Sequence, residues 1–170
     1  MKITLNIKLG IIAGLINCLA WYCFAKSFNY YSFKVELFRY YTTLLILLIG
    51  ISVSVFFERK KNGGFIEFKD ALKCGVLYSV LLSLILAVFN YFYYTFLVPD
   101  AVDFFVSEAK KSMVEGKLKE ESIAKSLEVV KSYFGSFRML MSTLIMGIIL
   151  SLIAGGIFRK KNPFTPFSAN

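Results

Sequence analysis

The chain has 170 residues, of which 57% are hydrophobic and 18% charged, and its formal net charge is +9. Soluble domains carry about 45–50% apolar and about 25% charged residues, so this composition excludes disorder and weighs against an ordinary soluble protein. The absence of histidine removes the commonest general base and metal ligand. The length and the mean hydropathy of +0.64 predict a single membrane domain over residues 1–170.

Four long segments without a charged residue are predicted to cross the membrane as helices. They cover residues 9–25, 40–57, 74–98 and 139–158. A helix needs about 17–25 apolar residues to cross the hydrocarbon core, whereas barrel strands are shorter and alternate in polarity. The first segment lacks a convincing cleavage site, so we expect it to remain as a span. The predicted fold class is therefore all-α, an integral membrane four-helix bundle.

The segment between the third and fourth spans, residues 99–138, is predicted to form two amphipathic helices outside the membrane. Pro99 and Asp100 offer a helix start, and Gly116 interrupts the pattern. Apolar residues recur at steps of three and four on both sides of this glycine, as on one face of a helix. This outer helical loop is too small to fold alone. It is expected to cap the bundle, lie on the lipid or dock a partner.

The distribution of charge predicts the topology. An even number of spans places both termini and the 58–73 loop on one side of the membrane. That side carries ten basic and three acidic residues, whereas the other carries ten basic and eight acidic. Two basic triplets, at residues 59–61 and 159–161, directly follow spans. Because basic loops stay in the cytoplasm, we expect both termini there. The same charges attract anionic lipid, so no nucleic-acid partner is invoked.

Small residues recur at every fourth position of the spans, which places them on shared helix faces. Such faces let helix backbones approach closely in lipid. The predicted helix-packing residues are Gly10 and Gly14 of the first span, Gly75, Ser79 and Ser83 of the third, and Gly147, Ser151 and Gly155 of the fourth. We interpret these faces chiefly as contacts within the bundle, with homodimerisation as the alternative.

Asn17 and Asn90 are the only amides inside the spans. Each is expected to face the bundle, either in an interhelical hydrogen bond or as a polar point on a substrate path. No ionisable residue lies inside the four segments, which weighs against proton coupling and voltage sensing. Aromatic residues gather near the outer ends of the spans, where an anchoring belt at the lipid headgroups is expected.

No catalytic constellation is visible in the sequence. It contains no phosphate-binding loop, dinucleotide fingerprint or nucleophile elbow, so we predict no catalytic residue and no cofactor. Three scattered cysteines without histidine also predict no metal site. Asp70, Asp100 and Asp103 lie at span edges and leave an enzyme acting on a lipid-linked substrate as the weakest hypothesis.

The run from Gly63 to Gly75 resembles a signature of the domain-of-unknown-function 4199 family of small bacterial multi-span membrane proteins. The motif residues are Gly63, Gly64, Phe68, Ala71 and Gly75, together with the pair Pro99 and Asp100 at the end of the third span. The resemblance implies a multi-pass protein of the bacterial inner (cytoplasmic) membrane. It supplies no activity and carries over no catalytic residue.

Two classes of function rank above the enzyme hypothesis. The first is a non-catalytic accessory or assembly subunit of the cell envelope, which would bind another membrane protein. The second is a small transporter, channel or lipid-handling protein, acting as a homo-oligomer, in which Asn17, Asn90 and the Ser79–Ser83 face would line a path. Membrane lipid is an expected partner in both.

Overall fold

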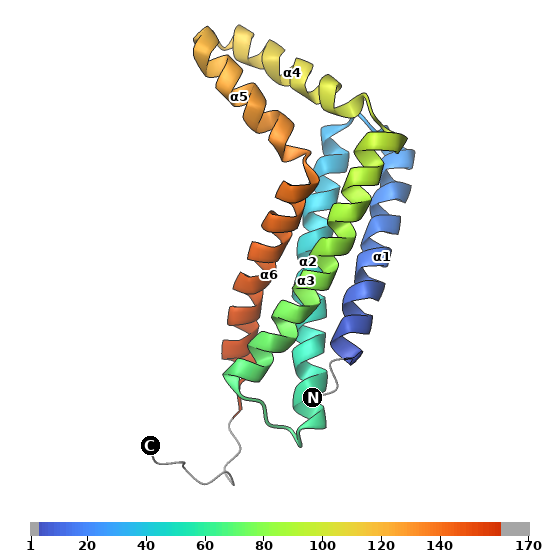
Figure 1. Ribbon diagram of the computed structural model, residues 1–170, viewed down its shortest axis with the longest axis vertical. Coiled ribbons are helices and arrows are strands. Elements are labelled where there is room, and N and C mark those ends of the chain that lie inside the picture. The colour runs from blue at the N-terminus through green and yellow to red at the C-terminus, as the bar shows by residue number, and fades with distance from the viewer. Residues whose placement is uncertain (1–3, 161–170) are drawn as a thin grey trace.

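The computed structural model describes residues 4–160, which form six α-helices and one π-helical turn (Figure 1). In chain order these are α1 (Thr4–Phe28), α2 (Phe33–Lys61), α3 (Phe68–Phe92), η1 (Tyr93–Leu97), α4 (Ala101–Glu115), α5 (Glu120–Tyr133) and α6 (Ser136–Phe158). The helices α1, α2 and α6, and α3 together with η1, are long and apolar enough to cross a membrane. The predicted all-α membrane bundle is therefore confirmed.

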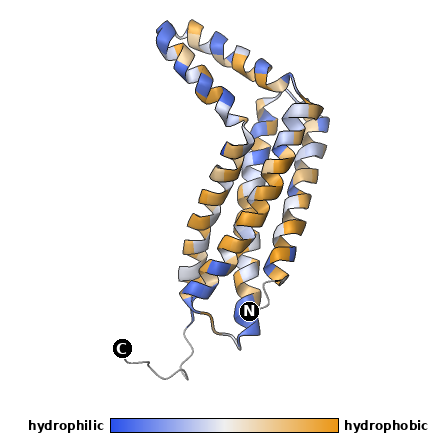
Figure 2. Cartoon of the chain, viewed as in Figure 1, coloured by the Kyte–Doolittle hydropathy of each residue, from blue (hydrophilic) through white to orange (hydrophobic). Residues whose placement is uncertain are grey.

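The four long helices are apolar along most of their length (Figure 2), and apolar side chains lie on the outer surface of the bundle as well as in its core. Large side chains that face away from the neighbouring helices, such as Leu15, Leu48, Val88 and Ile149, are about half exposed. In water such a surface would be an unusually large apolar patch. Helices that are apolar on all sides are typical of a protein solvated by lipid tails.

All four spanning helices begin earlier than their uncharged segments predict, and the differences are largest in α2 and α3. Helix α2 starts at Phe33 instead of residue 40, and α3 starts at Phe68 instead of residue 74. The prediction ended each span at its first charged residue, but a charge does not interrupt the backbone hydrogen bonds of a helix. The added turn of α3 carries the exposed Lys69 and Lys73, whose long side chains can extend to water.

Helix α3 is the centre of the bundle and packs against α1, α2 and α6. Its closest neighbour is α6, and predicted small residues face one another across this interface. A Cβ atom on Gly147 would overlap the side chain of Ser79, and one on Gly75 would lie only 2.7 Å from Ser151 Cβ. Ser79 Oγ and Ser151 Oγ donate to backbone oxygens of their own helices, so both hydroxyl groups are satisfied within this close contact.

The other predicted packing residues lie at related contacts. A Cβ atom on Gly10 would lie 3.0 Å from Leu81 Cβ, and one on Gly14 would lie 2.9 Å from the Ile85 side chain, so both glycines of α1 face α3. Ser83 is buried, and its hydroxyl donates to a backbone oxygen of α3. At the far end of α6, Gly155 faces the start of α3.

Helices α4 and α5 form a hairpin that extends beyond one end of the bundle (Figure 1). The two predicted amphipathic helices are thus present, and they pack against each other. Only Ala101 and Ile123 within these two helices are buried. Asp100 precedes α4 at the N-cap position, but its side chain forms no capping hydrogen bond.

The loop at the opposite end turns at a glycine pair. Gly63 and Gly64 have φ angles of +69° and +89°, which a residue with a Cβ rarely adopts. The chain then pairs in antiparallel fashion with the residues that follow α6, where Ile66 and Lys160 exchange two backbone hydrogen bonds of 2.9 and 3.0 Å.

The aromatic residues near the outer ends do not all form a belt. Tyr41 and Phe96 are more than 60% exposed, as anchoring residues would be, but Trp21 and Tyr93 are only 1% exposed. The belt prediction is wrong for this second pair. Their rings contact each other inside the bundle in a tilted arrangement, with centroids 4.5 Å apart and an angle of 35° between the ring planes, because α1 and η1 turn them toward each other.

Candidate functional site

A buried ion pair lies at the end of the bundle from which the hairpin extends. Glu36 and Arg39 of α2 are 6% and 5% exposed, and Arg39 Nη2 lies 2.6 Å from Glu36 Oε2. Residues three apart share a helix face, which lets these side chains meet. The sequence analysis placed no ionisable residue inside a span, because the uncharged segment begins only at residue 40. The structure corrects this, since α2 carries the pair into the bundle.

Groups from three other elements complete a polar cluster around the pair. Tyr94 Oη donates to Glu36 Oε1 over 2.6 Å, and Arg39 Nη1 donates to Asn90 Oδ1 over 3.0 Å. Asn90 Nδ2 donates to the backbone oxygen of Phe134, 2.8 Å away at the α5–α6 junction. Buried charges need such partners because an unpaired charge in a low-dielectric interior is costly. The cluster therefore ties α2, α3, η1 and the base of the hairpin together.

Aromatic rings cover the Arg39 guanidinium. Its carbon lies 4.9 Å from the centre of the Trp21 ring and 5.6 Å from that of Tyr133. A cation is attracted to the negative face of an aromatic ring, most strongly where water is excluded. Trp21 comes from α1 and Tyr133 from α5, so Arg39 joins the bundle to the hairpin.

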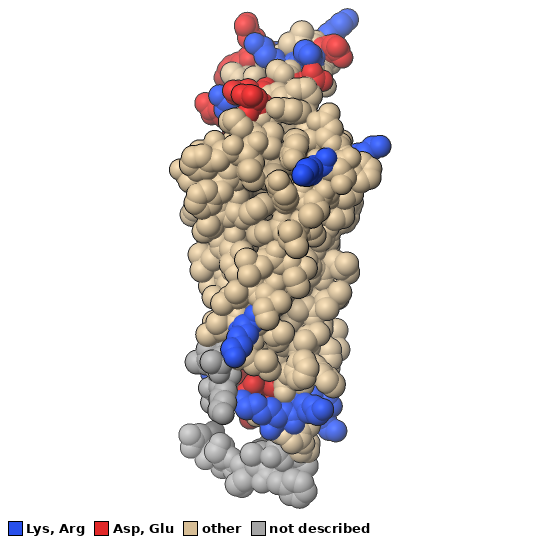
Figure 3. Space-filling model, turned by 90° about the vertical axis from the view of Figure 1, so that its right-hand side faces the viewer, with Lys and Arg blue, Asp and Glu red and all other residues tan. Residues whose placement is uncertain are grey.

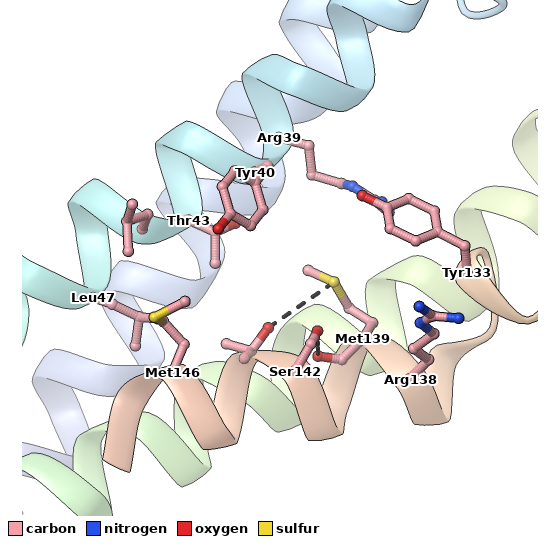
Figure 4. Close-up of a pocket in the computed structure, with 11 residues that line it drawn as sticks. Arg39, Tyr40, Thr43, Leu47, Tyr133, Arg138, Met139, Ser142 and Met146 are labelled. Atoms are coloured by element: carbon pink, nitrogen blue, oxygen red, sulfur yellow. Dashed lines mark hydrogen bonds between the residues drawn. The ribbon is translucent and has the colours of Figure 1, made fainter. Parts of the chain in front are cut away.

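A cavity of about 210 Å³ opens beside this cluster, between α2 and α6. Figure 4 shows Arg39 and Tyr40 reaching it from α2, and Met139, Ser142 and Met146 reaching it from α6. Arg39 is buried, whereas Tyr40 and Ser142 are exposed. The cavity therefore opens at the side of the bundle, where a lipid would be its neighbour.

The two ends of this lateral pocket differ in polarity. Arg39 and Arg138 lie at the hairpin end, with Tyr133 beside both (Figure 4). Leucine and methionine side chains, among them Leu47 and Met146, line the other end, and no carboxylate contributes to the lining. The pocket is thus amphipathic, with its positive end toward the hairpin.

Arg138 differs from Arg39 in its partners. It is exposed, and its Nη1 atom donates to Ser132 Oγ over 2.8 Å. Among residues 4–160, no Asp or Glu oxygen lies within 4 Å of it. Arg39 is neutralised by Glu36, so the pocket keeps one uncompensated positive charge, on Arg138.

The two amides predicted as points on a polar path lie behind the pocket wall. Asn17 Nδ2 of α1 donates to Thr43 Oγ1 over 2.9 Å, and Asn90 of α3 binds Arg39. Thr43 and Arg39 are one turn apart on α2, and both line the pocket. Both amides therefore form hydrogen bonds with residues of the pocket wall and hold those residues in place.

The structure does not gather the carboxylates on which an enzyme would depend. Asp70 lies at the start of α3, whereas Asp100 and Asp103 lie at the opposite end of the bundle, near the start of α4. Within residues 4–160, no three His, Cys, Asp or Glu side chains form a cluster that could hold a metal ion.

The motif residues at the start of α3 have packing roles. Phe68 is the first residue of α3 and lies over Gly155 of α6, Ala71 is fully buried, and Gly75 accommodates Ser151. Pro99 and Asp100 form the turn between η1 and α4.

Sequence reasoning missed Arg39 and Arg138 because it treated charged residues as loop residues, and it gave no role to Thr43 within the second span. A signal was present in the spacing of Glu36, Arg39 and Thr43, which are three and four residues apart and share one helix face. The contribution of Tyr133 had no such signal, since it depends on how the hairpin returns to the bundle.

These features define a multi-pass α-helical membrane protein. The chain belongs to the family described as "Protein of unknown function (DUF4199)", which matches residues 8–160. The resemblance seen in the glycine-rich motif is thereby confirmed. Searches of curated proteins and of solved structures gave no match.

Proposed function

We propose that this protein is a non-catalytic accessory or assembly subunit of the bacterial cell envelope, held in the inner membrane. The observation that carries the proposal is the α4–α5 hairpin. It projects past the bundle while the apolar stripes of its helices remain largely half-buried (Figure 1). A small helical pair of this kind gains stability when a further surface covers it.

The exposed residues at the tip of the hairpin favour a protein, rather than a lipid surface, as its partner. Val114 and Leu118 near the tip are 56% and 50% exposed, although this part lies at the far end from the bundle. The flanking helices carry exposed ion pairs, Glu108 with Lys111 and Glu121 with Lys125. An apolar tip between charged flanks fits the apolar centre and polar rim of a protein interface.

Replacement of the apolar tip is expected to release the partner. In the Val114→Ser/Leu118→Ser variant, a protein that co-purifies in stoichiometric amount from native membranes in mild detergent should be lost. The matched control, Lys110→Ser/Glu115→Ser, changes two exposed polar residues of α4 and should retain it. Quantitative mass spectrometry of the purified complexes measures both. Equal retention by the two variants would refute the hairpin as the interface.

The charge distribution supports an orientation with both chain termini in the cytoplasm. On the face shown in Figure 3, Lys and Arg dominate the end where α1 begins and α6 ends. The hairpin end carries both signs (Figure 3). An excess of Lys and Arg in short loops marks the cytoplasmic side.

A reporter experiment tests this orientation. Alkaline phosphatase, which is active only outside the cytoplasm, should be active when inserted at Gly116 and inactive when inserted after Gly63. A fluorescent protein that folds only in the cytoplasm should give the opposite pattern at the same two positions. Phosphatase activity at Gly63 would overturn the proposed orientation.

The lateral pocket favours a second candidate, lipid handling, over ion transport. Asn17 and Asn90 bind Thr43 and Arg39 in the pocket wall, which gives them a structural role. The pocket itself opens at the side of the bundle, as a site for a membrane lipid would.

A further inference from the structure

We propose that the lateral pocket between α2 and α6 binds one anionic phospholipid, with the phosphodiester at Arg138 and part of an acyl chain between the helices. This inference deepens the lipid-handling candidate and does not depend on the accessory role. It commits to a membrane lipid because the pocket joins a cationic end to an apolar one at the side of a spanning bundle.

The net charge of the pocket lining favours a ligand that carries a single negative charge. Glu36 compensates Arg39, at 2.6 Å, and no carboxylate contributes to the lining. Arg138 remains as the one lining cation without a carboxylate within 4 Å among the described residues. A guanidinium presents a planar fork of N–H donors that matches phosphate oxygens. A monoanionic phosphodiester such as that of phosphatidylglycerol would neutralise the charge of Arg138. A zwitterionic headgroup would bring its own cation into the same site.

The size of the pocket sets how much of the lipid it holds. Its volume of about 210 Å³ is below the ~300–1,000 Å³ of pockets that enclose a drug-sized ligand. The pocket therefore takes the phosphate and the upper part of one chain, against Leu44, Leu47 and Met146. The remainder of the lipid stays in the bilayer, which the open side allows.

The position along the bundle agrees with this pose. Arg138 lies in the first turn of α6, at the end of the span where lipid headgroups meet water. Exposed Tyr133 and Tyr40 flank it, and rings with one polar tip suit the headgroup level. The apolar lining extends from there toward the middle of the span.

A lipid titration of the full-length protein in non-ionic detergent tests the proposal. Thermal stabilisation is measured with phosphatidylglycerol, phosphatidylethanolamine and inorganic phosphate, at about 1 M salt, where the Debye length is about 3 Å and only charges in direct contact still attract each other. Native mass spectrometry counts the lipids retained. We expect one phosphatidylglycerol bound at least about tenfold more tightly than phosphatidylethanolamine, and no stabilisation by phosphate.

Three variants locate the site. Arg138→Gln should weaken phosphatidylglycerol binding by about tenfold or more, which is the loss expected for a charge-assisted hydrogen bond. Ser142→Phe should also weaken it, by filling the mouth of the pocket without changing the charge. The charge-matched control Lys26→Gln, at the same end of the bundle on α1, should bind within about twofold of the native protein.

Each contrary result overturns the proposal. Equal effects of Arg138→Gln and Lys26→Gln would show general attraction of anionic lipid. Stabilisation by inorganic phosphate alone would show an anion site without a lipid. Equal binding of phosphatidylglycerol and phosphatidylethanolamine would show that the charge of the headgroup does not determine which lipid binds. Loss of the co-purifying protein in the hairpin variant is a separate measurement, so failure of the accessory role and failure of the lipid site are distinguishable.

Discussion

The Arg39→Met variant is expected to lose about 3–5 kcal/mol of its free energy of unfolding, the cost of removing one partner of a buried ion pair. Glu36 would then lie at 6% exposure without its cationic partner, with Tyr94 as its remaining partner, and Asn90 would lose the donor to its side-chain oxygen. Unfolding of the purified protein in mixed micelles, titrated with a denaturing detergent, measures the change.

Two controls separate the ion pair from the loss of a long side chain. The double variant Glu36→Gln/Arg39→Met removes both charges and should be more stable than Arg39→Met alone. Lys125→Met breaks an exposed pair with Glu121, for which a loss of about 1 kcal/mol or less is expected. A double variant no more stable than Arg39→Met alone would contradict the ion pair as the source of the effect.

This ion pair also explains how the hairpin is placed. Arg39 contacts Tyr133 of α5, and it holds Asn90, which binds the backbone of Phe134 at the α5–α6 junction. Charged residues in a membrane span are costly and commonly mark a function. Here the same arginine lines the lateral pocket and supports the base of the hairpin, so the two candidate functional regions share one element.

The second large effect is expected at the closest helix contact. Gly147→Val should destabilise the protein by about 3 kcal/mol, because over-packing of a close contact costs ~1–3 kcal/mol and more where backbones are held rigidly. A Cβ atom at this position would overlap the Ser79 side chain, so α3 and α6 would have to separate. The same detergent titration measures the loss.

The chain offers a matched control and a rescue for this variant. A Cβ atom on Gly156, also in α6, would meet no heavy atom within 4 Å, so Gly156→Val should stay within about 1 kcal/mol of the native protein. Ser79→Gly removes the atoms that Gly147→Val would strike, and the double variant should recover much of the lost stability. No recovery would mean that the contact between α3 and α6 is not the cause.

The positions of the membrane spans could be predicted from the sequence because a lipid bilayer imposes a simple rule. A span must be long, apolar and internally hydrogen-bonded, and composition alone reveals such a segment. The turn at Gly63 and Gly64 was also visible, since glycine tolerates positive φ angles. The motif around Phe68 and Gly75 was enough to indicate the family.

The pocket and its cluster could not be predicted in the same way. Arg39 was assigned to a loop because a charge ends an uncharged segment. Its place in the bundle depends on Glu36 beside it, Asn90 from α3 and Trp21 from α1, which approach only after the helices pack. Arg138 and Tyr133 come together only when the hairpin returns to the bundle.

The sequence by itself determined that this is an all-α protein with four membrane spans and two amphipathic helices between the third and fourth spans, because these properties follow from local composition and periodicity. Only the tertiary structure decided which polar groups are buried, since the cost of burying a charge depends on partners far apart in the chain. It likewise decided that α2 and α6 leave a lateral opening with an arginine whose charge no nearby carboxylate compensates. That opening depends on how the helices pack, which no single segment encodes.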